Sequence, residues 1–226
     1  METVIKYGVL PLALLMSYIQ YYFIKRTDKF PKAEKKGENL YLKALPVVML
    51  LTAIYMIVFY KSGKLFLYWK ETAILSILWV VAYVDYKCQL IFNEYLFMAL
   101  GIRVLFLIVE LFASPELAIA QLLTELIGVL CLLGFGFVMR FLSRKGMGMG
   151  DIKLLAIMPL FLGTLNAFQA VLYSMIIIFV QACVCLITHK KGRKDVLPFA
   201  PAIFGGAALV IFFIRAYFGR NKSEKL

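Results

Sequence analysis

The chain has 226 residues, of which 63% are hydrophobic and 17% are charged, and its mean hydropathy is +0.86. This composition excludes an ordinary soluble globular domain. The formal net charge of +12 suits contact with anionic lipid headgroups and gives little support to nucleic-acid binding, so we expect no nucleic-acid partner. We predict an all-α polytopic membrane protein, a transmembrane helical bundle in the lipid bilayer that forms one domain over residues 1–226.

Apolar runs close to the length that crosses a bilayer recur along the chain. The first run precedes its basic cluster and is not followed by a small-residue cleavage site, so we expect a span rather than a cleavable signal. The sixth run is short for a complete crossing, and the seventh is the cleanest. The eight predicted spans lie at about 4–24, 43–60, 67–84, 95–113, 119–140, 152–165, 167–187 and 197–217.

The distribution of Lys and Arg predicts the orientation of this bundle. Loops 25–43, 85–94, 140–153 and 188–196 carry sixteen of the 25 basic residues, and eight, Lys70 among them, fall on the opposite side. Because basic loops stay in the cytoplasm, we expect the N-terminus outside the cytoplasmic membrane and these four loops inside.

Two acidic residues lie at predicted membrane boundaries on the cytoplasmic side. Asp85 follows the third span, and Asp151 opens the sixth directly after Gly148-Met149-Gly150. A carboxylate beside a span is costly unless it is paired, protonated or hydrated, so it indicates a functional site. Glycines allow close approach of the backbone. The alternatives are a glycine turn capped by Asp151 and two independent acids hydrated at the headgroups.

Two carboxyl groups from different helices at one depth are what an aspartyl protease needs. One ionised carboxylate takes a proton from water, while the other, protonated, donates to the scissile carbonyl. Two such groups a few ångströms apart share one proton and titrate as a pair. Asp85 and Asp151 fit this requirement.

Three blocks of the sequence resemble the type IV prepilin peptidases, a family of GxGD intramembrane aspartyl proteases. The first runs from Asp85 to Asn93 with the family's spacing, although Phe92 replaces the usual proline. The second is Gly146-Met147-Gly148-Met149-Gly150-Asp151-Ile152-Lys153-Leu154. The third is Leu197-Pro198-Phe199-Ala200-Pro201-Ala202, where Ala200 replaces a glycine. Together they cover about residues 80–205 in the family's order.

The resemblance implies an aspartyl endopeptidase that removes the short basic leader of prepilin-like membrane proteins at the cytoplasmic face. It implies Asp85 and Asp151 as the catalytic pair. The residues expected to bind or position substrate are Gly148, Gly150, Asn93, Lys153, Pro198 and Pro201. Because proline disfavours helix before it, the eighth span should begin irregularly. Its unpaired carbonyls could hold an extended peptide, or the segment is an ordinary helix start.

Many bacterial members of that family carry a cytoplasmic insertion with paired CxxC motifs that bind zinc, and they also N-methylate the new terminus. Here loop 25–43 is short and has no cysteine, and no two of the four cysteines form a CxxC. We therefore expect no structural zinc site, no other metal and no cofactor. Methyltransferase activity stays open.

The sequence lacks the residues that other proteases need, and it shows no inverted repeats of the kind common in transporters. The one histidine, His189, lies in a basic loop without HExxH, and no membrane Ser–His pair is available. The second function class is a transporter or channel that uses Asp85 and Asp151 for protons or cations. The ordered motifs favour the protease over it, and the short chain and the Asn93 spacing disfavour a presenilin-like protease. Arg103, inside a predicted span, is expected to pair with Glu110 or Glu125.

Overall fold

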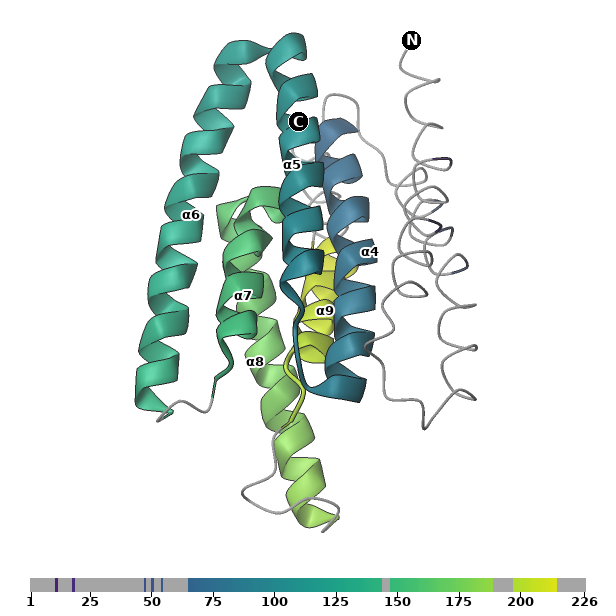
Figure 1. Ribbon diagram of the computed structural model, residues 1–226, viewed down its shortest axis with the longest axis vertical. Helices are drawn as coiled ribbons and strands as arrows, with labels where there is room; N and C mark the ends of the chain where they lie inside the picture. The colour runs from purple at the N-terminus through teal and green to yellow at the C-terminus, as the bar shows by residue number, and fades with distance from the viewer. Residues whose placement is uncertain are drawn as a thin grey trace, which may run out of the picture.

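The computed structural model describes residues 65–143, 147–188 and 197–214, together with the single positions 11, 18, 47, 50 and 54. Apart from those positions, the predicted spans 4–24 and 43–60 lie outside the described residues, as do loop 25–43 and His189. The described part is helical throughout and contains no strand (Figure 1), which confirms the all-α class.

Six α-helices follow one another, and they match the third to eighth predicted spans to within a few residues at most ends. A turn of π-helix, Val210–Ile214, follows the last of them. The helices are α4 Leu65–Cys88, α5 Asn93–Ala113, α6 Pro115–Leu142, α7 Met149–Leu162, α8 Thr164–Ile187 and α9 Ala200–Leu209.

Three of these helices, α5, α6 and α8, are long and apolar enough to cross a membrane. Large apolar side chains such as Phe112, Leu130 and Phe179 are exposed on them, as lipid contact requires. The other three differ from the expected spans. Helix α4 carries several charged residues, α7 has 14 residues and α9 has 10, and 14 residues make only about 21 Å of helix. The prediction of about eight crossings is therefore not confirmed.

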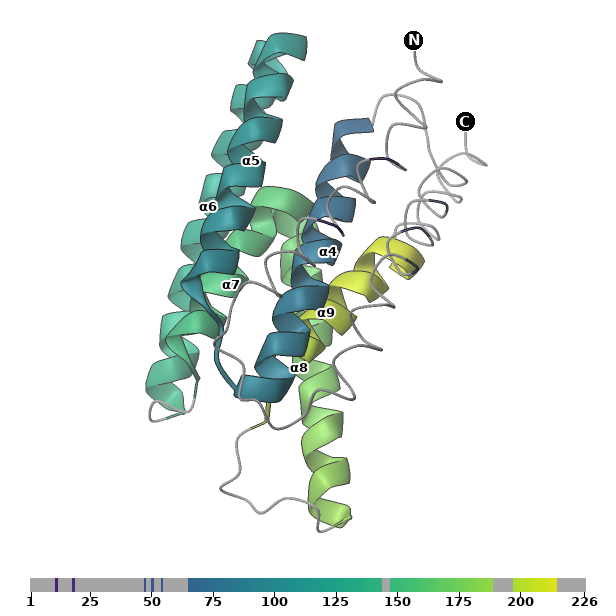
Figure 2. The same cartoon turned by 45° about the vertical axis from the view of Figure 1, so that its right-hand side comes forward.

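Helices α5 and α6 form a long hairpin, and α7 runs back along α6 until the chain reverses at Gly163 (Figures 1 and 2). Gly163 has φ +78°, a conformation that favours glycine. Directly after it, the Thr164 hydroxyl donates to the carbonyl of Thr124 in α6 at 2.5 Å. Helix α7 therefore ends just before Gly163, two residues before the predicted end of the sixth span at 165. The Thr164–Thr124 hydrogen bond attaches this end of α7 to α6.

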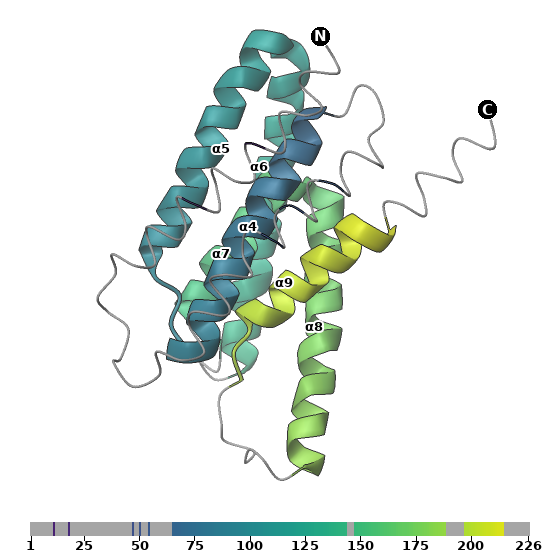
Figure 3. The same ribbon diagram turned by 90° about the vertical axis from the view of Figure 1, so that its right-hand side faces the viewer.

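Helix α9 crosses obliquely between α4 and α8 (Figure 3). The crossing with α8 is tight at Gly206, where an added Cβ would collide with the carbonyl oxygen of Ala170 and the side chain of Ser174. Only glycine fits there, so α9 packs closely on α8. The first residue of α9 lies at the end of α4. This placement matters for the site described below.

Four charged side chains form a buried cluster between α4, α5 and α6. The Nζ atom of Lys70 lies 3.0 Å from carboxylate oxygens of both Glu110 and Glu125. The guanidinium of Arg103 lies 3.1 Å from Glu110 and 2.6 Å from Glu125. The predicted pairing of Arg103 is confirmed. Lys70 was counted among the basic residues of the opposite side, but its charge is neutralised inside the bundle, so it gives no signal about orientation.

Candidate active site

Asp85 lies in the last turn of α4 and is 5% exposed. Its Oδ2 atom accepts a hydrogen bond from the backbone N–H of Ala200, the first residue of α9, at 2.9 Å, and the N–H of Phe199 also donates to this carboxyl group. The first N–H groups of a helix have no partner within it, and the helix dipole favours negative charge there. The start of α9 therefore supplies the hydrogen-bond donors of a buried acid on another helix.

Asp151 is the third residue of α7 and is half-buried. Its Oδ2 atom accepts the backbone N–H of Gly148 at 3.2 Å. Asp151 thus caps the helix that carries it, as the first alternative expected. It also lies close enough to Asp85 for the two charges to interact, so capping and pairing occur together.

The surroundings of the two acids shift their acidities unequally. Both residues fall just outside the predicted spans 67–84 and 152–165. Burial first, and the charge of Asp85 second, raise the pKa of Asp151 to about 6 against the effect of the Gly148 N–H. Burial raises the pKa of Asp85 as well, and the N–H groups of Ala200 and Phe199 oppose it. Two carboxyl groups whose charges interact in this way can hold one proton between them.

The linker between α4 and α5 packs against the start of α7 and keeps the two acids near one another. Gln89 adopts φ +53°, and its N–H donates to the Asp85 carbonyl at 2.8 Å, which ends α4 one turn after the acid. Two residues further on, Ile91 lies against Gly150, where an added Cβ would come within 2.8 Å of the Ile91 Cβ. Gly150 is therefore a close-approach glycine directly before Asp151.

The remaining predicted site residues are in two places. Asn93, the first residue of α5, accepts a hydrogen bond from the Lys153 Nζ atom at 2.9 Å, and both side chains are exposed. Pro198 lies in the non-helical segment 197–199, and Pro201 is the second residue of α9. The irregular start of the eighth span is thus confirmed. From the sequence we expected the carbonyl groups of this segment to hold a peptide. In the structure, its N–H groups donate to Asp85 instead.

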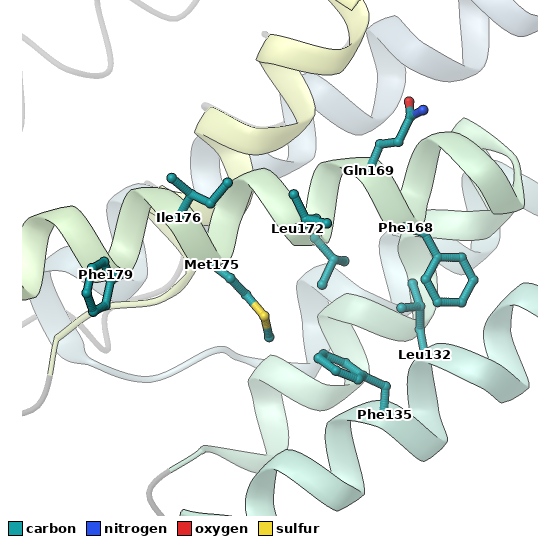
Figure 4. A pocket seen from close by; sticks show the side chains of 9 residues that line it. Leu132, Phe135, Phe168, Gln169, Leu172, Met175, Ile176 and Phe179 are labelled. Atoms are coloured by element: carbon teal, nitrogen blue, oxygen red, sulfur yellow. The ribbon is translucent and has the colours of Figure 1, made fainter.

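An apolar groove lies elsewhere, between α6 and α8 (Figure 4). It encloses about 630 Å³, and Gln169 is the one polar residue among the nine that line it. Neither aspartate belongs to this lining. The groove therefore has no group for acid–base chemistry. Across the described residues, no cluster of three or more His, Cys, Asp or Glu side chains is arranged to hold a metal ion.

The fold and the site define a helical membrane protein with two interacting carboxyl groups at the ends of neighbouring helices. Residues 72–187, about half of the chain, match the model of the type IV leader peptidase family. The chain belongs to this family, and the resemblance predicted from the sequence is confirmed.

A curated relative is similar over much of the same region. The prepilin leader peptidase/N-methyltransferase of Bacillus subtilis (strain 168) is 31% identical over 146 residues, which are 62% of this chain and 53% of the relative. The match therefore spans about half of the relative's length. No solved structure matches the chain.

Proposed function

We propose that this protein is a membrane-embedded aspartyl endopeptidase that removes the leader of prepilin-like membrane proteins. The observation that carries the proposal is that Asp85 and Asp151 lie at the ends of two helices that pack together, α4 and α7, with the Asp85 charge acting on the Asp151 carboxyl group, in a chain of the leader peptidase family. The name of the Bacillus relative supports the same substrate class. The second activity in that name, N-methyl transfer, is not part of the proposal.

The environments of the two acids suggest different roles in hydrolysis. Asp85 has two backbone N–H donors and is proposed to be the ionised base that takes a proton from the attacking water. Asp151, whose pKa is raised to about 6, is proposed to hold the shared proton and donate it to the scissile carbonyl oxygen. When the tetrahedral intermediate collapses, Asp85 gives its proton to the leaving amine and Asp151 takes back the proton of the intermediate's hydroxyl, so the pair returns to its singly protonated state.

The position of the pair suits a cut at the border between a polar leader and an apolar helix. Asp85 and Asp151 lie at the ends of α4 and α7, next to the basic loops predicted to be cytoplasmic. We propose that the active site faces the cytoplasm, where the leader lies. The exposed pair of Lys153 and Asn93 is proposed to bind the substrate beside the bond that is cut, and Pro198 and Pro201 to place the α9 N-terminus.

The direct test replaces each acid by its amide. Asp85→Asn and Asp151→Asn keep the shape of the side chain but cannot exchange the proton, so each should abolish cleavage of a purified prepilin-like precursor in liposomes. The double variant should be no worse than either single one, because the two groups act as a unit. Glu116→Gln, the same change at an exposed acid in the first turn of α6, should keep the wild-type rate. Substantial cleavage by either Asp variant would refute the proposal.

A further inference from the structure

A chain of hydrogen bonds connects the end of α6 to the acid on α7 through a single peptide group. The Arg140 Nη1 atom donates to the carbonyl oxygen of Met147 at 2.5 Å. The N–H of Gly148 belongs to that same peptide unit, and it donates to Asp151 Oδ2 at 3.2 Å. A guanidinium, a peptide and a carboxyl group therefore lie in series.

Two physical effects follow from this arrangement. A donor on the oxygen of a peptide polarises it and strengthens its N–H as a donor, and a charged donor does so most. The contact also fixes the plane of the peptide, because Arg140 is half-buried in the last turn of α6 while Gly148 has no side chain to hold it. The orientation of the one backbone donor to Asp151 thus depends on Arg140.

We propose that Arg140 is a positioning residue: through the Met147–Gly148 peptide it orients the carboxyl group of Asp151 toward Asp85. The inference rests on the proposed catalytic role of Asp151. The other charged residues near the ends of the helices that meet Asp151 are Asp85 and Lys87 in the last turn of α4, Glu94 in the first turn of α5 and Lys153 on α7. The remaining charged residues of α4 and α5, Lys70, Glu71, Arg103 and Glu110, lie further along those helices. Helices α8 and α9 carry no Asp, Glu, Lys, Arg or His.

The first experiment compares Arg140→Gln with Arg144→Gln, which removes the same charge from the same basic loop. Cleavage of the precursor is measured in liposomes across pH. Arg140→Gln should lower kcat by about tenfold, the effect of losing one charged hydrogen bond, with little change in KM. It should also shift the alkaline limb of the pH profile upward, because a weaker N–H donor stabilises charged Asp151 less. Arg144→Gln should match the wild type, and Arg140→Lys should recover part of the rate.

A double-mutant cycle tests the route of the effect. Gly148 has φ −67°, which proline also adopts, so Gly148→Pro deletes the N–H in a compatible backbone. Gly148→Ala keeps the N–H and adds a Cβ. Adding Arg140→Gln should lower the cleavage rate of the Gly148→Ala variant further. It should leave the rate of the Gly148→Pro variant unchanged, because that variant has already lost the N–H that Arg140 acts through.

Three outcomes would overturn the inference. They are equal losses in Arg140→Gln and Arg144→Gln, a wild-type rate and pH profile in Arg140→Gln, and additive effects of Arg140→Gln and Gly148→Pro. Melting temperatures in detergent, matched among the variants compared, separate positioning from misfolding. Cleavage by Asp151→Asn would instead refute the proposed function, so the two failures are distinguishable.

Discussion

Gly150 is the position where a single added carbon should do most damage to the carboxyl pair. Its Cβ would lie 2.8 Å from the Cβ of Ile91, and the Cγ1 and carbonyl oxygen of Ile91 lie at 3.5 Å. Two non-bonded carbons are at their best separation at about 3.5–4.0 Å. Either the α4–α5 linker or the start of α7 must therefore move by roughly 1 Å, and the movement separates Asp85 from Asp151.

The size of the effect follows from that displacement. A misplacement of about 1 Å can cost about a hundredfold in rate when two groups must act on one water. We therefore expect Gly150→Ala to lower cleavage by about a hundredfold and Gly150→Val by more, since a β-branched residue also restricts the backbone. Gly148→Ala should be milder. The only close neighbour of its added Cβ would be the Asp151 Oδ2 atom, at 3.0 Å, while the Asp151 Cγ and the Gly150 N lie at 3.8 and 4.0 Å, and the Asp151 side chain can rotate.

The assay is leader cleavage by purified variants at equal concentration in liposomes. Gly101→Ala and Gly134→Ala are matched controls in α5 and α6, because an added Cβ meets nothing within 4 Å at either position. Both should keep the wild-type rate. Ile91→Gly removes the opposing Cβ and should restore part of the activity of Gly150→Ala. Wild-type activity in Gly150→Ala, or losses as large in the two controls, would refute the steric argument.

Three further outcomes are expected from the structure. Cleavage should fall by roughly tenfold per pH unit above the Asp151 pKa of about 6, because the reaction needs this acid protonated. A rate that stays constant from about pH 6 to 8 would contradict that role. Glu125→Gln leaves buried positive charge uncompensated and should cost about 3 kcal/mol of unfolding free energy in detergent, so an unchanged melting temperature would count against the buried cluster. In a cysteine-free background, Pro115→Cys should react with an impermeant thiol reagent in intact cells. Ser143→Cys, at the other end of α6, should react only after lysis. The reverse pattern would invert the proposed orientation.

The helices could be predicted from the sequence where a long apolar run fixes them. Helices α5, α6 and α8 begin and end close to the predicted boundaries because few charges interrupt them. The reversal at Gly163 was placed later in the chain, since one residue with φ +78° is enough to turn it. The partners of Lys70 lie 40 and 55 residues away. Such a pairing is decided by tertiary packing, whereas a charge count along the chain could only place this lysine on one side of the membrane.

The sequence could predict the two acids of the candidate site, because their side chains carry the chemistry, but not the backbone groups that bind them. Asp85 and Asp151 stand out because an acid beside a span is unusual. The donors to Asp85 are backbone N–H groups of Phe199 and Ala200, which any residue except proline possesses, so no side chain marks them. The glycines before Asp151 were expected to allow close approach, but the residue that approaches, Ile91, became visible only in the fold.

This dependence on backbone explains why two departures from the family pattern leave the site intact. Phe92 stands where proline is usual, yet its φ of −73° and ψ of 136° lie in the region that proline adopts. The entry into α5 therefore keeps the proline geometry without the ring. Ala200 replaces a glycine but retains the N–H that binds Asp85 at 2.9 Å, and its side chain is fully buried. What the site requires of these positions is a backbone direction and a donor rather than a particular side chain. Ala200→Pro, which removes the donor, should therefore disturb Asp85 more than Ala200→Gly, which keeps it.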